Sequence, residues 1–103
     1  MRRIRILEEA AEEALEAAAW YESQRRGLGQ AFSRVIEDAL DLLQDEIVPL
    51  LSVPTFGGGR TKRLTLRRFP YDIVLTSEQD TIVVIAFAHH SRRPGYWRDR
   101  RPT

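Results

Sequence analysis

The chain has 103 residues, of which 43% are hydrophobic and 30% are charged. This length and composition are typical of one globular domain and exclude a disordered chain. The lack of cysteine excludes disulfides and thiolate metal sites, and no apolar run approaches the roughly 20 residues that span a bilayer. We therefore expect a single cytoplasmic domain over residues 1–103, without cofactor or metal.

The net charge of +1 conceals an uneven distribution of charge along the chain. Residues 1–50 carry six Arg against eleven Asp or Glu, a balance of −5. Residues 51–103 carry nine Arg and one Lys against four acidic residues, a balance of +6. This split indicates an acidic face for solubility and a basic face for an anionic partner. The alternative is that helices favour Glu and strand ends favour Arg for solubility alone.

The first half of the chain predicts a strand followed by two helices. Residues 2–7 alternate as a strand, and the Ala/Glu/Leu-rich sequence from Glu8 predicts a helix that ends near Arg26. Its buried line is expected along Ala11, Leu15 and Ala18, with Trp20 and Tyr21 partly in the core. After Gly27 and Gly29, residues 30–45 predict a second helix. Its apolar stripe consists of Phe32, Val35, Ile36, Ala39, Leu40 and Leu43.

The second half predicts three strands. Residues 47–59 contain two prolines and three consecutive glycines and predict a loop. Strands are expected over residues 61–66, 71–76 and 81–88, with a turn at 67–70 and a hairpin loop at 77–80. Residues 81–88 are apolar at both odd and even positions, as in a central strand that is covered on both faces. The predicted fold is α+β: an N-terminal strand, an antiparallel two-helix hairpin, then a three-stranded antiparallel sheet.

Two basic segments contain most of the side chains suited to binding. Residues 88–100 hold two histidines, four arginines and the rings of Tyr96 and Trp97. Residues 60–68 hold Arg60, Lys62, Arg63, Arg67 and Arg68. Arginine forks, imidazoles and aromatic rings are suited to phosphates, nucleobases or an acidic partner.

Three motifs resemble toxins of the RelE/ParE superfamily, the toxic half of bacterial type II toxin–antitoxin modules. They are residues 14–22 (ALEAAAWYE) followed by 27–32 (GLGQAF), residues 67–74 (RRFPYDIV), and residues 84–100 (VIAFAHHSRRPGYWRDR). The motifs occur in the family's order and span nearly the whole chain. Two positions depart from the pattern: Leu75 stands where the family often has an aromatic residue, and Lys62 is the only lysine.

The resemblance implies one of two mechanisms. RelE-like toxins cleave ribosome-bound mRNA without a metal, which requires a base, an acid and cations to stabilise the phosphate. The catalytic candidates are then Arg68, Arg92, Arg93, Tyr96 and His89, and the candidates for phosphate or target contact are Arg60, Lys62, Arg63 and Arg67. ParE-like toxins bind DNA gyrase without chemistry. The single lysine leaves the ribonuclease set incomplete, so we favour gyrase.

The same residues also have structural interpretations. His89 can end a buried strand by bonding a backbone group, Tyr96 and Trp97 can lock the tail onto the sheet, and residues 69–71 can form a turn. A third functional alternative is an inactive homologue that binds only its antitoxin. In each case the resemblance implies a hetero-oligomer with a cognate antitoxin, a segment of which folds over the helix hairpin or the sheet.

Overall fold

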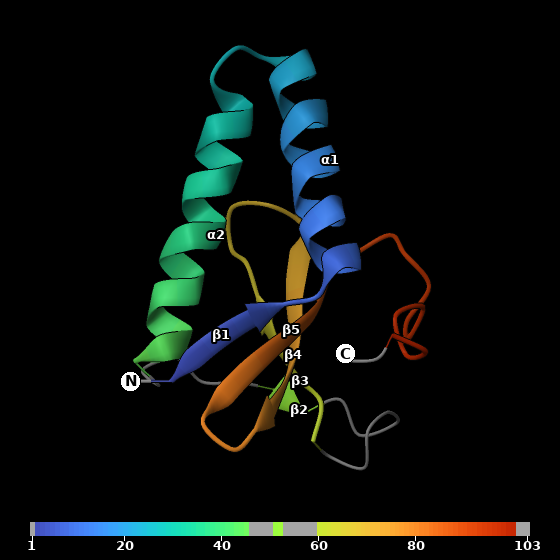
Figure 1. The fold of residues 1–103 in the computed structure, drawn as a ribbon. Helices are drawn as coiled ribbons and strands as arrows, with labels where there is room; N and C mark the ends of the chain where they lie inside the picture. The colour runs from blue at the N-terminus through green and yellow to red at the C-terminus, as the bar shows by residue number, and fades with distance from the viewer. Residues whose placement is uncertain (1, 46–50, 53–59, 101–103) are drawn as a thin grey trace.

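The computed structural model describes residues 2–45, 51–52 and 60–100. Two helices lie on one side of a five-stranded sheet with the strand order β1-β5-β4-β3-β2 (Figure 1). The elements are β1 (Arg3–Ile6), α1 (Glu8–Gln24), α2 (Leu28–Gln44), β2 (Leu51–Ser52), β3 (Lys62–Thr65), β4 (Tyr71–Glu78) and β5 (Thr81–His89). This confirms the predicted α+β fold with a helix hairpin against a mainly antiparallel sheet. Neither described helix is long and apolar enough to cross a membrane.

Strand β5 lies between β1 and β4, and its six residues Ile82–Phe87 are all buried. It pairs antiparallel with β4 along its whole length and parallel with β1 over Thr81–Val84 only. The prediction of a strand covered on both faces is confirmed. The predicted loop at residues 77–80 was too long, because Ser77 and Glu78 continue β4. A two-residue turn then closes the hairpin, with Gln79 at a positive φ of 54°.

The buried face of α1 differs from the predicted one. Ala10, Ala17 and Tyr21 are buried, whereas Leu15 is 72% exposed and Trp20 is 59% exposed. The predicted line of Ala11, Leu15 and Ala18 was therefore rotated by about one residue, roughly 100° around the helix. Alanine occupies so many positions of α1 that its periodicity does not define one apolar face.

The two helices approach each other closely at the start of α2. A side chain at Gly29 would collide with the Ala18 carbonyl oxygen and come within 2.9 Å of the Glu22 Cβ atom. The Glu22 carboxylate accepts hydrogen bonds from the Gly27 N–H (3.0 Å) and the Gly29 N–H (3.1 Å). Glu22 of α1 thereby satisfies backbone donors at the start of α2 that have no partner within that helix.

An aromatic cluster joins the helices to the sheet. Tyr21 of α1 and Phe32 of α2 have ring centroids 5.2 Å apart, and Phe69 lies 4.8 Å from Tyr21 and 5.1 Å from Phe32. Tyr71 of β4 completes the cluster at 5.1 Å from Phe32. The predicted turn at residues 67–70 is confirmed as a bend that buries Phe69 in the core. The predicted stripe of α2 is confirmed by the buried side chains of Phe32, Ile36, Ala39 and Leu43.

Most of the predicted loop at residues 47–59 lies outside the described residues. Within it, Leu51–Ser52 form the short strand β2, which pairs with Lys62 and Arg63 of β3. The loop prediction was wrong for these two residues, which add a fifth strand at the edge of the sheet.

We expect the substitution Gly29→Ala to lower the free energy of unfolding by about 1–3 kcal/mol, because its methyl group would push α1 and α2 apart. Urea denaturation followed by circular dichroism would measure the change. The control is Gln30→Ala at the adjacent exposed position, which should have little effect. Equal stability of the Gly29→Ala variant and the wild type would contradict the close helix contact.

Candidate functional site

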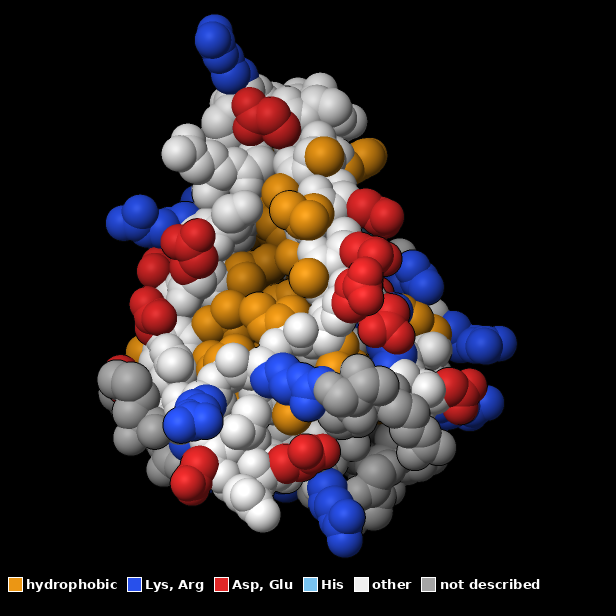
Figure 2. All heavy atoms as spheres, in the orientation of Figure 1, with side chains coloured by type: hydrophobic (Ala, Val, Ile, Leu, Met, Phe, Trp, Pro, Cys, Tyr) orange, Lys and Arg blue, Asp and Glu red, His pale blue; other side chains and the backbone are white. Residues whose placement is uncertain are grey.

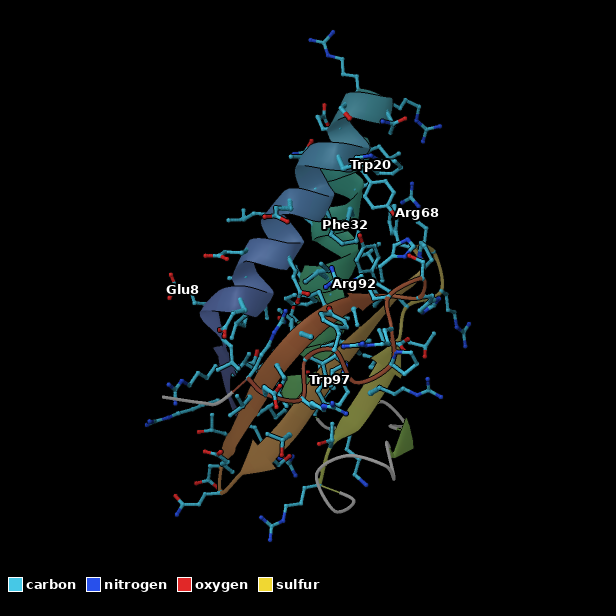
Figure 3. All side chains as sticks on the ribbon, turned by 90° about the vertical axis from the view of Figure 1, so that its right-hand side faces the viewer. Glu8, Trp20, Phe32, Arg68, Arg92 and Trp97 are labelled. Carbon is cyan, nitrogen blue, oxygen red and sulfur yellow. The ribbon has the colours of Figure 1, made fainter. Side chains whose placement is uncertain are left out.

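Residues 91–100, the C-terminal arm, follow β5 and fold back as a series of turns. Backbone hydrogen bonds join Tyr96 N–H to the Arg93 carbonyl (3.2 Å) and Arg98 N–H to the Gly95 carbonyl (3.0 Å). Gly95 has a φ of +77°, a conformation that favours glycine. Trp97 is 6% exposed and packs with the core, as the structural interpretation of this ring expects. Figure 3 shows Trp97 and Arg92 on the arm, in front of the sheet.

The arm covers an open edge of β5. Beyond the hydrogen bond from Leu7 N–H to the Val84 carbonyl, β1 ends, and none of the described strands follows it along β5. The Phe87 N–H donates to Glu13 Oε1 of α1 (3.1 Å), and Arg100 Nη1 of the arm donates to the Ile85 carbonyl (3.1 Å). Two side chains thus replace the hydrogen bonds that a neighbouring strand would supply.

Glu13 and Arg100 also bind each other. Arg100 Nη1 lies 2.7 Å from Glu13 Oε1, and Arg100 Nη2 lies 3.1 Å from Glu13 Oε2. Their side chains are only 16% and 17% exposed, so the two-point ion pair is largely protected from solvent. The pair joins the first helix to the end of the described chain.

Tyr96 belongs to the same network. Its hydroxyl donates a hydrogen bond to Glu13 Oε2, and its ring lies 4.1 Å from the Arg92 guanidinium carbon. Burial raises the pKa of Tyr96 well above its usual value, and the hydrogen bond to Glu13 raises it further. The nearby Arg100 and Arg92 lower the pKa by less. Tyr96 therefore stays protonated at neutral pH.

A cleft of about 370 Å³ lies between the arm and the face of the sheet opposite the helices. We call it the basic cleft; its charged and imidazole side chains are Arg63, Asp72, His89, His90, Arg92 and Arg93. Asp72 Oδ1 lies 3.0 Å from His90 Nε2, and Asp72 Oδ2 lies 3.5 Å from Arg63 Nη1. The Asp72 side chain is 15% exposed, so this carboxylate orients His90 at the cleft wall.

A smaller cleft of about 300 Å³ lies between the arm and α1. Its walls are mainly aromatic, and we call it the aromatic cleft; it is lined by Glu13, Glu16, Ala17, Trp20, Tyr71, Phe87, His89, Arg92 and Tyr96. His89, Arg92 and Tyr96 line both clefts and form the wall between them. The His89 ring packs edge-on against Tyr71 at 5.0 Å, and its Nδ1 accepts the Ser91 N–H at 3.0 Å.

The structure brings together only part of the predicted site. His89, Arg92, Arg93 and Tyr96 line the basic cleft, and Arg63 joins them from β3. Lys62 neighbours Arg63 on the same strand, so its side chain points to the opposite face. Arg60, Arg67 and Arg68 are exposed but line neither cleft. The Arg68 guanidinium carbon instead lies 5.3 Å from the centre of the Phe69 ring. Figure 3 shows Arg68 apart from Arg92.

Four contributors to the site were not predicted: Glu13, Trp20, Asp72 and His90. Glu13 is one of five glutamates in α1, and Asp72 is one acidic residue within a strand. No sequence pattern distinguishes these two carboxylates from the others, because only the fold shows that Glu13 meets Arg100 and that Asp72 meets His90. Among the described residues, no three His, Asp or Glu side chains gather in a way that could hold a metal ion.

The helices carry a separate apolar surface. Figure 2 shows an apolar strip between α1 and α2 on the face away from the sheet. Ala18 contacts Gly29 of α2, so the α1 face that holds Ala11, Leu15 and Ala18 borders this strip. We call these three residues the helix-face strip. Ile6 of β1 is also partly exposed, at 38%.

No protein-family model and no curated protein matches the sequence. Among solved structures, a chain of the chromosomal ParDE TA system from P. aeruginosa is similar to this one, with a TM-score of 0.69 and 16% sequence identity. The match covers 86% of this chain and 96% of that chain. Likeness at this identity establishes a shared fold, and it confirms the RelE/ParE-like fold that the sequence motifs predicted.

The raised pKa of Tyr96 predicts a specific pH dependence of stability. A folded pKa above the unfolded value, which is about 10, gives stability that is present below that value and is lost as the pH rises towards the folded pKa. The stability advantage of the wild type over Tyr96→Phe should therefore shrink between about pH 9 and 11. Urea unfolding of both proteins across this range would measure it. A constant difference would contradict the buried hydrogen bond, since Tyr21 and Tyr71 are present in both proteins.

Proposed function

We propose that this chain is the toxin of a type II toxin–antitoxin module and that it acts by binding DNA gyrase. The observation that carries the proposal is the shared fold with a chain of a ParDE system, together with a basic arm fixed on that fold. Arg92 and Arg93 are exposed on the arm beside Arg63, so three guanidinium groups are available to an acidic or phosphate-bearing surface.

Binding without chemistry is supported by the state of the proton-transfer candidates. The Tyr96 hydroxyl donates a hydrogen bond to Glu13 and its pKa is raised, so Tyr96 keeps its proton and is unsuited to act as a base near neutral pH. Lys62 lies on the far face of β3 from Arg63. His89 uses Nδ1 to accept the Ser91 N–H, which fits a residue that shapes the turn after β5.

A cognate antitoxin would cover the helix-face strip. Leu15 is exposed between the half-buried Ala11 and Ala18, and such an apolar row along a helix is typical of a surface that binds an amphipathic helix. Leu15 is 72% exposed at the centre of α1 and makes the largest apolar contribution to this face. The proposed antitoxin surface and the basic arm are on different sides of α1, because Glu13, which holds the arm, is on the opposite side of the helix from Leu15.

A specific observation favours ribonuclease activity as the second candidate function. His90 is oriented by Asp72 in a cleft that also contains Arg63, Arg92 and Arg93. A histidine held by a carboxylate is a suitable base, and the arginines could stabilise a pentavalent phosphate. In this alternative, His90 replaces His89 and Tyr96 as the residue that moves a proton.

Expression of the chain without its antitoxin separates the two functions. We expect growth arrest with double-strand breaks that depend on gyrase, unchanged total mRNA, and at least a tenfold weaker effect of the Arg92→Ala variant. His90→Ala should remain toxic, because binding needs no base. Loss of transcripts that His90→Ala abolishes would contradict gyrase binding and support the ribonuclease. Normal growth with soluble, folded protein would contradict both and indicate an inactive homologue.

We expect Leu15→Glu to weaken binding of the cognate antitoxin by at least tenfold, because it places a charge in the apolar strip. The exposed position of Leu15 should keep the thermal stability unchanged. Calorimetric titration with the antitoxin encoded alongside would measure the affinity, with Glu12→Ala on the exposed acidic side of α1 as the control. Wild-type affinity of the Leu15→Glu variant would place the antitoxin elsewhere.

A further inference from the structure

The Glu13 carboxylate makes contacts that exceed the needs of a helix surface residue. It accepts hydrogen bonds from the Phe87 N–H of β5, from both Arg100 amino groups and from the Tyr96 hydroxyl. Its neighbours on the same side of α1, Glu12 and Glu16, are exposed and make no such contacts among the described residues. One carboxylate therefore connects α1, the open edge of β5 and two residues of the arm, Tyr96 and Arg100.

We propose that Glu13 is the positioning residue of the C-terminal arm, and that it places Arg92 at the wall between the two clefts. The role given to Arg92 rests on the proposed function. The geometric chain is short: Glu13 fixes the Tyr96 hydroxyl, and the Tyr96 ring supports the Arg92 guanidinium at 4.1 Å. Glu13 itself is covered by Arg100 and Tyr96, so it acts through the arm and does not present its charge to a partner.

Two anchors hold the arm against the rest of the fold: the buried ring of Trp97 and the contacts of Tyr96 and Arg100 with Glu13. Backbone bonds within the arm are local turns, each joining residues three apart. Arg100 reaches the Ile85 carbonyl only in the geometry that its pairing with Glu13 imposes. Without the carboxylate, the Arg100 guanidinium would be a poorly compensated charge at the β5 edge and would turn outwards to water.

Trp97 provides a direct measure of the position of the arm. The chain has two tryptophans, so the substitution Trp20→Phe leaves Trp97 as the only one, and it is 6% exposed. In this background Glu13→Gln should shift the Trp97 emission to longer wavelength and raise its acrylamide quenching at least twofold. Glu12→Gln, which makes the same change of charge at an adjacent exposed residue of α1 that lines neither cleft, should do neither. Unchanged Trp97 emission in Glu13→Gln would overturn the proposal.

A double-mutant comparison distinguishes positioning from a general loss of stability. If Glu13 acts through Arg100, then Arg100→Gln alone should release Trp97, and Glu13→Gln combined with Arg100→Gln should be no worse than either single variant. The circular dichroism of the helices should stay native in all three. Additive effects, or melting of the helices together with the arm, would show that Glu13 is merely structural and would overturn the proposal.

Growth inhibition then tests the part that rests on the proposed function. Released Trp97 with at least tenfold weaker growth inhibition in Glu13→Gln, and unchanged inhibition in Glu12→Gln, would support both statements. Released Trp97 with full growth inhibition would support positioning by Glu13 and overturn the role of the arm in target binding. Unchanged Trp97 with full growth inhibition would overturn the positioning role and leave the proposed function standing.

Discussion

The structure depends on how the backbone N–H and C=O groups at the open edge of β5 find hydrogen-bond partners. β5 lies inside the sheet between β1 and β4, yet β1 covers only Thr81–Val84, which leaves backbone groups of the next residues without a strand partner on that side. A buried donor or acceptor left without a partner costs about 1–3 kcal/mol. Glu13 and Arg100 provide these partners from opposite ends of the chain, 87 residues apart. Docking of the arm is thus a consequence of completing the sheet.

This solution also determines the layout of the surface. Because the arm passes across the end of β5, it has the basic cleft on one side and the aromatic cleft on the other. The acidic residues of α1 separate the arm from the helix-face strip. The helix-face strip and the two clefts thus occupy different parts of the surface, and α1 borders both the strip and the aromatic cleft.

Residue types predicted the site less well than they predicted the fold. The basic segments indicated an anion-binding surface, and five of the expected residues, Arg63, His89, Arg92, Arg93 and Tyr96, do meet at one cleft. Lys62 was expected to contact the target together with Arg63, but it lines neither of the two clefts, because strand alternation sends neighbouring side chains to opposite faces. Glu13 and Asp72 were missed because their roles depend on Arg100 and Arg63, which the fold brings close to them. No local sequence pattern predicts these contacts.

The sequence by itself determined the order of helices and strands, the apolar stripe of α2 and the burial of β5, because these depend on periodicity within a single element. It also determined the family likeness of the fold through motifs spread along the chain. Only the tertiary structure decided which face of the alanine-rich α1 is buried, that β1 runs parallel to β5, and that the arm is held by Glu13. These features depend on contacts between distant segments, and a one-dimensional pattern does not encode which of several similar glutamates or alanines will meet them.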